Sequence, residues 1–280
     1  MFENVVVGID GSANGQDAIA LAAALRAPGG KLTLAHVYTG ELRPSTAITP
    51  GLAREEQDAA EQLLADARRE AGAKDAEVVA VMAYSPGRGL HELAERENAD
   101  LLVVGSCGRG RFGRVFVGDD ARAAMNGAPC AVAIAARSYA QRQAPLARIG
   151  VGYDGSSESE AALGIARALA SGAGTHARVL ETVPIPVYPA IGMGPPTQQL
   201  TDELVEDAGK RLRALAGVES RAVSGVPGEE LAAFSGELDL LVVGSRAYGP
   251  VRRLIVGSTS NYLERHARCS LLVIPRAAED

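Results

Sequence analysis

The sequence contains the same motifs twice, in the same order. VVVGIDGS at residues 5–12 recurs as IGVGYDGS at 149–156, and ADLLVVGSCGRG at 99–110 recurs as LDLLVVGSRAYG at 238–249. SPGRGLHELA (85–94) corresponds to GVPGEELAAF (225–234), and APCAVAIA (128–135) corresponds to ARCSLLVI (267–274). A repeat of about 140 residues has the length of a whole domain, whereas solenoid repeats are much shorter. We therefore predict two domains, residues 1–140 and 146–280.

Each copy alternates short apolar runs with helical patterns. In the first copy the runs are NVVVGI, LTLAHV, EVVAVM, LLVVG and AVAIA, with Pro28-Gly29-Gly30 expected to end the first helix and a long helix expected over about 52–71. Runs that are apolar on both faces are typical of parallel strands covered by helices. We predict an α/β fold of two Rossmann-like domains, each a five-stranded parallel sheet between helices. Such domains bind ligands beyond the carboxyl ends of the strands, where the strand order reverses.

A glycine-rich loop follows the fourth predicted strand of each copy and leads into a helix. Candidate anion-binding residues are Gly105, Gly108 and Gly118 in the first loop, and Gly244, Arg246, Gly257, Ser258 and Thr259 in the second. Free N–H groups at a helix N-terminus favour an anion, and glycine lets the backbone approach a phosphate closely. The alternative is ordinary turn chemistry with a helix N-cap. The same spacing in two copies favours a phosphate site.

Two further positions recur at the carboxyl ends of the predicted strands. Asp10 and Asp154 each end the first strand of a copy and precede Gly-Ser. Each is either a turn-forming residue or a carboxylate that accepts hydrogen bonds from a ribose or a base. Val37 and Val183 lie near the ends of the second strands, where a backbone N–H and C=O could meet an adenine edge. The four histidines form no cluster, and we interpret them as structural.

Composition narrows the functional classes. The net charge of −6 argues against nucleic acid or membrane surfaces as partners, and no apolar run approaches the length of a membrane span. Three scattered cysteines and no basic, apolar leader predict a cytoplasmic protein with free thiols. Walker, nucleophile-elbow and HExxH motifs are all missing, so nothing is aimed at rapid hydrolysis of a nucleotide. We predict no catalytic residues and no metal ligands, with enzymatic activity limited to a slow ATPase at most.

The motif order VVVGIDGS, a Pro-Gly turn, LLVVGS-x-G-x9-G and a closing apolar strand resembles the universal stress protein family, in its nucleotide-binding branch. The resemblance covers both copies and implies a tandem member with an adenine nucleotide alpha hydrolase-like fold. It implies ATP or AMP as the ligand, with or without Mg²⁺, and a role in the stress response. The aspartates would then contact ribose or adenine, the valine backbones the base, and the glycine loops the phosphates. Pairing of the last strands, 131–135 with 270–274, would join the domains as an internal pseudo-dimer, and a homodimer of the whole chain is a further option.

Neither copy matches the family's G-x2-G-x9-G-[ST] motif fully. The first has Asp119 where a hydroxyl is expected, followed by Asp120, and a carboxylate near a triphosphate is repulsive. The second keeps Gly257-Ser258 but has Ala247 in place of the second glycine. We therefore rank the second site above the first for ATP. The competing hypothesis is a nucleotide-independent scaffold with degenerate loops. The proline-rich segment 184–199 is expected to be either a flap over the second site or a surface loop.

Overall fold

The computed structural model describes residues 1–39, 52–107, 115–142, 145–184, 198–245, 254 and 257–275. The first half contains β1 (Phe2–Gly8), α1 (Ala13–Leu25), β2 (Arg26–Tyr38), α2 (Leu52–Glu70), β3 (Glu77–Met82), α3 (Pro86–Arg96), β4 (Leu101–Gly105), α4 (Asp119–Met125), β5 (Ala131–Ala135) and the 3₁₀ turn η2 (Tyr139–Gln141). The second half contains β6 (Ile149–Tyr153), α5 (Ser157–Gly172), β7 (Ala177–Val183), α6 (Gln198–Arg213), β8 (Val218–Ser224), α7 (Pro227–Phe234), η3 (Ser235–Glu237), β9 (Leu240–Gly244), α8 (Ser258–His266) and β10 (Ser270–Ile274).

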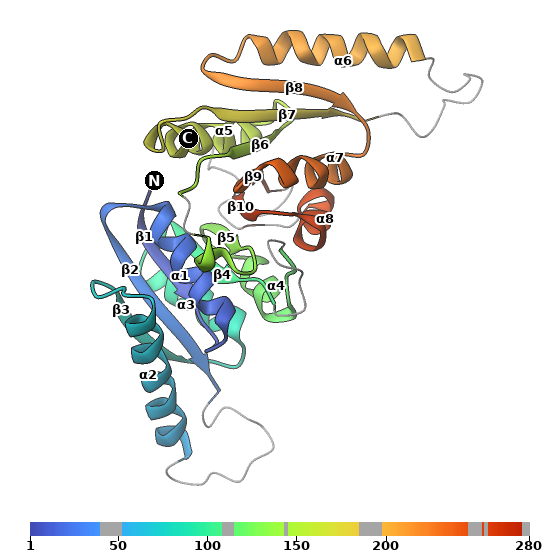
Figure 1. The fold of residues 1–280 in the computed structure, drawn as a ribbon. Coiled ribbons are helices and arrows are strands. Elements are labelled where there is room, and N and C mark those ends of the chain that lie inside the picture. The colour runs from blue at the N-terminus through green and yellow to red at the C-terminus, as the bar shows by residue number, and fades with distance from the viewer. Residues whose placement is uncertain are drawn as a thin grey trace, which may run out of the picture.

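The strands form one ten-stranded sheet in the order β3-β2-β1-β4-β5-β10-β9-β6-β7-β8 (Figure 1). Within each half the neighbouring strands are parallel, which confirms the predicted α/β class. β5 and β10 pair antiparallel, with Leu271 opposite Ile134 and Val273 opposite Val132. The two halves are thus joined through their last strands, as the family resemblance implied, and their two five-stranded sheets continue into one another.

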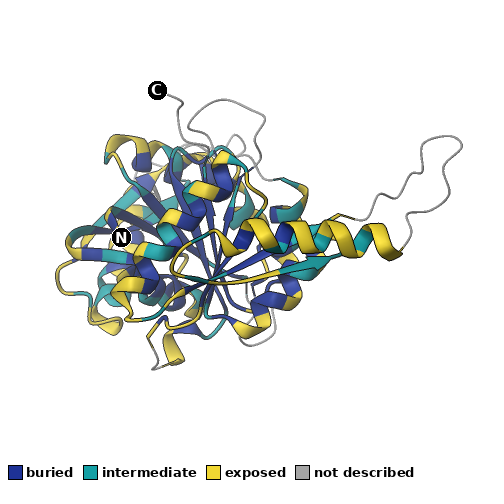
Figure 2. Cartoon of the chain, turned by 90° about the horizontal axis from the view of Figure 1, so that it is seen from above, coloured by how far each residue is buried: buried dark blue, intermediate teal, exposed yellow. Residues whose placement is uncertain are grey.

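Helices cover both faces of the sheet. One apolar core lies beneath α1, α2, α5 and α6, and a second lies beneath α3, α4, α7 and α8. Each core contains buried residues from both halves of the chain, so the cores divide by sheet face and not by sequence half. Figure 2 shows the buried strands at the centre and the largely exposed α6 projecting at the rim. None of the described helices combines the length and apolar character needed to cross a membrane.

The first helix ends earlier than predicted. α1 ends at Leu25, and Pro28-Gly29-Gly30 lies inside β2, where the register to β1 shifts between Phe2 and Asn4. The residue before a proline is disfavoured in helical conformation, so Ala27 already belongs to extended chain. Gly29 has a φ of +79°, which suits the irregularity in the strand. The expectation that this tripeptide ends the helix was wrong, because the strand begins directly after Leu25.

Candidate functional site

Two pockets lie at the carboxyl ends of the strands, one in each half. In each half the strand order reverses between the first and fourth strands, β1 and β4 or β6 and β9, and the pockets open at that point. The first has a volume of about 180 Å³ and the second of about 490 Å³. Only the second falls in the usual range for small-molecule sites, roughly 300–1,000 Å³. Because β5 and β10 are antiparallel, the carboxyl ends of the strands in the two halves point in opposite directions. The two pockets therefore open on opposite sides of the sheet along the strand direction.

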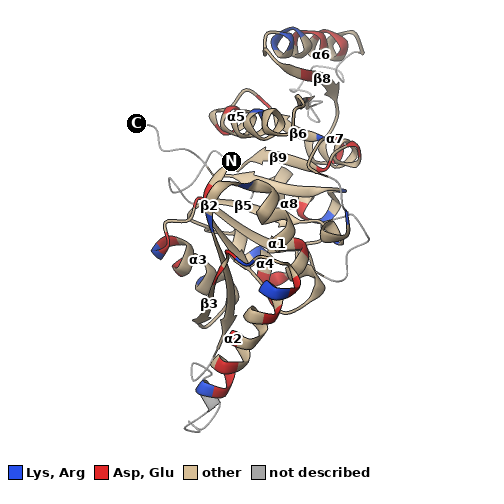
Figure 3. Ribbon diagram, turned by 60° about the vertical axis from the view of Figure 1, so that its left-hand side comes forward, with Lys and Arg blue, Asp and Glu red and all other residues tan. Residues whose placement is uncertain are grey.

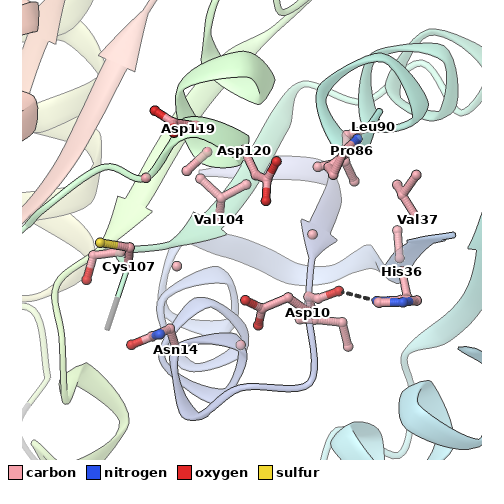
Figure 4. A pocket seen from close by; sticks show the side chains of 18 residues that line it. Asp10, Asn14, His36, Val37, Pro86, Leu90, Val104, Cys107, Asp119 and Asp120 are labelled. Atoms are coloured by element: carbon pink, nitrogen blue, oxygen red, sulfur yellow. Dashed lines mark hydrogen bonds between the residues drawn. The ribbon is translucent and has the colours of Figure 1, made fainter. Parts of the chain in front are cut away.

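Asp10 and His36 form one side of the first pocket (Figure 4). Asp10 follows β1, and its Oδ1 accepts a hydrogen bond of 3.0 Å from the backbone N–H of Ser12. Ser12 in turn caps α1, because its hydroxyl accepts from the N–H of Asn14. His36 Nδ1 lies 2.8 Å from the carbonyl oxygen of Ile9, which fixes its ring at the pocket wall beside Val37. The turn-forming role of Asp10 is therefore present, and its side chain is still exposed toward the pocket.

The same arrangement recurs around Asp154 in the second pocket. Its Oδ1 accepts hydrogen bonds from the Ser156 N–H at 3.0 Å and from the Ser156 hydroxyl at 2.5 Å. Burial acts to raise the pKa of Asp154, but the bonds from Ser156 and Ser159 outweigh burial and hold that pKa below its ordinary value. Asp154 is therefore a carboxylate at neutral pH, available as an acceptor.

The strand register changes which residues correspond between the pockets. Gly8 pairs with Ala35, and Gly152 pairs with Leu180, so the counterpart of Val37 is Thr182 and not Val183. Thr182 and Val183 both line the second pocket. The Thr182 hydroxyl is buried and has no hydrogen-bond partner within the described part of the chain. The second pocket thus offers a polar group where the first offers a methyl group.

Gly105 and Gly244 lie at the ends of β4 and β9, where each packs against the first turn of a helix. A Cβ atom on Gly105 would come within 2.4 Å of the Asn14 carbonyl oxygen, and one on Gly244 within 2.6 Å of the Glu158 Cβ. These glycines are required by close packing between strand and helix, whatever else they contact. Both line their pockets.

Gly118 and Gly257 are the N-cap residues of α4 and α8. Their φ angles, −75° and −82°, lie in the range open to any residue. Neither helix has a side-chain hydrogen bond at its cap, unlike α1, α3 and α5, which serines cap. In the second pocket Ser258, Thr259 and Ser260 line the wall at this helix end. The first turn of α8 therefore presents N–H groups and hydroxyls to the pocket, a combination that suits an anion.

Carboxylates also line both pockets. In the first, Asp119 and Asp120 begin α4, and Figure 4 shows the Asp120 carboxylate directed into the hollow while Asp119 points away from it. In the second, Glu158 is 4% exposed and accepts a hydrogen bond of 3.1 Å from the Ser157 hydroxyl. Glu181 is paired with Arg211 of α6, whose Nη2 lies 2.5 Å from its Oε1. Arg211 brings positive charge to this pocket.

Ser106 and Ser245 carry buried hydroxyls that have no hydrogen-bond partner within the described ranges. They follow Gly105 and Gly244, they are 1% and 8% exposed, and each lines its pocket. Most buried polar atoms in proteins are paired, and leaving one unpaired costs about 1–3 kcal/mol. Neither serine was predicted from the sequence to belong to the site, and neither was Glu158 or Arg211. The repeated LLVVGS was a visible signal for the serines, whereas Glu158 and Arg211 reach the pocket only through helix packing.

Several predicted residues lie outside the part of the chain that the structure describes. These are Gly108 and Arg246, Ala247, the remaining arginines of both loops and most of segment 184–199. His91 Nε2 and His266 Nδ1 each lie within hydrogen-bond distance of a backbone carbonyl, those of Ala124 and Tyr262. Among the described residues no group of three or more His, Cys, Asp or Glu side chains could hold a metal ion. The three cysteines are free.

Comparison with known proteins gives a consistent picture. The model of the universal stress protein family matches residues 1–136 and again residues 146–275. Universal stress protein Rv2623 of Mycobacterium tuberculosis is 28% identical over 96% of this chain and 95% of its own length. The crystal structure of a universal stress protein from Archaeoglobus fulgidus shares the fold, with a TM-score of 0.72 over 98% of both chains at 19% identity. A universal stress protein solved in complex with cAMP matches 39% of this chain and 80% of its own, at 29% identity and a TM-score of 0.32.

Proposed function

The chain belongs to the universal stress protein family, and on that premise we propose that it binds an adenine nucleotide, ATP or AMP, as a cytoplasmic stress-response sensor or regulator with little or no turnover. The proposed domains are residues 1–140 and 146–280, and the second carries the better site. Asp154 would accept from the ribose or base, and the backbone around Thr182 and Val183 would meet the adenine edge. Gly244, Gly257, Ser258 and Thr259 would surround the phosphates.

The observation that carries this proposal is the buried Ser245 hydroxyl, which has no hydrogen-bond partner among the described residues and lies in the same pocket as the N-terminus of α8. Both features lie in one pocket, at the strand-order reversal where ligands of such folds bind. A ligand with anionic oxygens would supply acceptors both to the hydroxyl and to the free N–H groups of the helix. The Ser106 hydroxyl supports the same assignment for the first pocket.

Two differences favour the second pocket for a triphosphate. It is larger, and its helix begins with Ser258-Thr259-Ser260. In the first pocket the helix begins with Asp119 and Asp120, which repel phosphate by Coulomb interaction. The first site is accordingly proposed to hold AMP, adenosine or nothing. Mg²⁺ would arrive with the nucleotide, bound to its phosphates, and would offset part of the repulsion from Glu158.

Isothermal titration with ATP, AMP and adenosine tests the proposal. We expect Ser258→Asp to remove most of the affinity for ATP at the second site while leaving adenosine binding intact, because only the phosphate contacts are altered. The matched control is the reverse exchange in the first loop, Asp119→Ser with Asp120→Thr, which should increase ATP affinity there. Unchanged ATP binding in Ser258→Asp would show that the phosphates lie elsewhere. Mass spectrometry of small molecules that co-purify with the chain gives an independent answer.

A nucleotide-independent scaffold is the second candidate function. The close packing of Gly105 and Gly244 and the turn bonds of Asp10 and Asp154 would be needed in the fold without any ligand. If neither heat nor a thermal shift is detected at millimolar ATP, AMP and ADP, the scaffold is the surviving hypothesis. A homodimer of the whole chain stays a prediction, and light scattering on the purified protein checks it.

A further inference from the structure

Because β5 and β10 pair antiparallel, the residues that directly precede α4 and α8 contact the other half of the chain. β4 and β5 run opposite to β9 and β10, so the edge of the sheet where α4 begins is also the edge where α8 ends. The reverse holds at the other edge, where α8 begins and α4 ends. At the first pocket, the segment that leads into α4 therefore lies beside the C-terminal end of α8. At the second pocket, the segment that leads into α8 lies beside the C-terminal end of α4.

Backbone hydrogen bonds connect these segments on the first side. The N–H of Val117 donates to the Glu264 carbonyl at 3.0 Å, and the N–H of Val115 donates to the Ala267 carbonyl at 3.1 Å. Val117 directly precedes Gly118, the N-cap of α4 at the first pocket. Glu264 is in the last turn of α8, and Ala267 is its C-cap. The segment 115–117, which enters α4 at the first pocket, is thus bonded to the helix whose N-terminus lines the second pocket.

The second side repeats the arrangement with the halves exchanged. The N–H of Leu254 donates to the Ala128 carbonyl at 2.9 Å, and the N–H of Gly127 donates to the Leu254 carbonyl at 2.9 Å. Leu254 is fully buried three residues before Gly257, the N-cap of α8, and residues 127–128 directly follow α4. These four bonds are called the crossing bonds below.

An ion pair locks α4 against α8 between the crossing bonds. Arg122 Nε lies 3.1 Å from Glu264 Oε2, and the Glu264 side chain is fully buried. Such a buried pair fixes the relative position of two helices more than it stabilises the fold, because desolvation cancels much of the attraction. α8 is nine residues long, or about 13 Å, so it can act as a rigid rod between the two pockets.

We propose that α8 couples the two pockets positively, so that an anion bound at the second pocket restrains the segment 115–118, which enters α4 at the first pocket. An anion bound at Ser258 would fix the N-terminus of α8. The Arg122–Glu264 pair, together with the Val115 and Val117 bonds at the other end of α8, would transmit that restraint to the first pocket. Linkage requires the effect to be reciprocal. This inference rests on the proposed nucleotide binding at the second pocket.

Amide hydrogen exchange tests the coupling. ATP is added to the full-length chain at a concentration that saturates the calorimetric binding curve, and exchange is followed at the N–H groups of Val115 and Val117. We expect their exchange to slow by about 5-fold or more, the lower end of typical coupling between sites. Ser258→Asp should abolish this protection, because it blocks the second pocket and leaves the first unchanged.

A second variant isolates the route. Arg122→Asn with Glu264→Met places at each position the residue that the other copy carries there, Asn261 and Met125. The double variant should still bind ATP but lose most of the protection at Val115 and Val117. The exposed pair partner Arg69, on α2, provides the control Arg69→Asn, which should leave the protection unchanged. Binding heat without any change in exchange overturns the coupling and leaves nucleotide binding in place. Protection that persists in Ser258→Asp or in the double variant also overturns it, and the absence of any binding heat overturns both proposals.

Discussion

Glu158 places a buried acidic side chain in the second pocket, where it would oppose a bound phosphate. Its counterpart in the first copy is Asn14, and it carries a buried carboxylate beside Gly244 at the strand end. We expect Glu158→Asn to tighten ATP binding by about 1–2 kcal/mol, or roughly 5- to 30-fold, because a negative charge near the phosphates is removed. Affinity for adenosine should change little.

Titration calorimetry of the two ligands measures this difference. Glu160→Gln is the matched control, because Glu160 lies on the same helix, is bonded to the Tyr153 hydroxyl and does not line the pocket. ATP affinity that is unchanged or weaker in Glu158→Asn would place the phosphates away from this helix turn.

Asp239 makes the stability of the second half depend on pH. It accepts hydrogen bonds from the Arg148 N–H at 2.9 Å and from Arg148 Nη2 at 2.6 Å, and it also accepts from the Ala147 N–H. Burial acts to raise the pKa of Asp239, but these donors hold it below its ordinary value. In the unfolded chain its pKa is about 3.9. Its contribution to stability is therefore complete above that pH and is lost as the pH falls through the lower folded pKa.

Asp239→Asn should lower the free energy of unfolding by about 1–3 kcal/mol at pH 7, the usual loss for hydrogen bonds to a charged group. Urea unfolding at pH 7 and at pH 3 checks the sign, because the deficit of the variant should shrink in acid. Asp207→Asn is the control and should have little effect, because Asp207 is exposed and pairs with Lys210 on the same helix. A deficit as large at pH 3 as at pH 7 would contradict the ionic role.

Some residues that line the pockets could be predicted from the sequence and others could not. Asp10 and Asp154 were visible because each ends an apolar run and both recur in a repeated motif. Glu158 was not, because an acidic residue in the first turn of a helix is ordinary and only the approach of Gly244 places it in the pocket. Ser106 and Ser245 recur within the repeated LLVVGS motif, but the sequence does not show that their hydroxyls are buried without a hydrogen-bond partner among the described residues.

At the scale of elements, the junction between β4 and α1 depends on a glycine. Gly105→Ala would place a Cβ atom 2.4 Å from the Asn14 carbonyl, so strand or helix must move. We expect a loss of about 2 kcal/mol or more in the free energy of unfolding, within the range for overpacking. In contrast, a Cβ on Gly164 in α5 meets no atom within 4 Å. Gly164→Ala should stabilise the chain by about 0.5–1 kcal/mol, because alanine is the better helix former.

Denaturant unfolding of the two alanine variants measures this contrast. Equal effects in both would mean that the β4–α1 contact is looser than the structure indicates. The pair also separates packing from ligand binding, because the stability loss in Gly105→Ala is expected without any nucleotide.

The elements themselves followed largely from periodicity. Most continuous apolar runs became buried strands, whereas β3, at the edge of the sheet, is only partly buried. The predicted long helix, about 52–71, appears as α2 (Leu52–Glu70). Figure 3 shows acidic residues along α2, with basic residues toward its ends. The end of α1 was predicted too late, because Pro28 disfavours helical conformation already at Ala27. Gly29 and Gly30 were expected in a turn, but they fit the irregularity in β2 equally well. Contacts such as Val117 with Glu264 could not be predicted, since they arise only after the halves join.

At the scale of the whole molecule, the two halves should unfold together. Both apolar cores contain residues of each half, and the central β5–β10 pair lies within them. We expect one calorimetric transition with the van't Hoff enthalpy equal to the calorimetric enthalpy. Two resolved transitions would show that the joint is weaker than the domains. Saturating ATP should raise the single transition as a whole, because a ligand of the native state stabilises everything that unfolds with it.

The antiparallel β5–β10 pair joins two copies within one chain, so the symmetry that every contact has in a two-fold homodimer is not required here. In a two-fold homodimer each contact is made twice, so a substitution at the axis always alters both sides. Here the Arg122–Glu264 pair stands on one side of the pseudo-axis, while the corresponding positions on the other are Asn261 and Met125. Because the two copies are fused in one chain, a substitution in one copy leaves the other unchanged. The residues that line one pocket can therefore diverge from those that line the other.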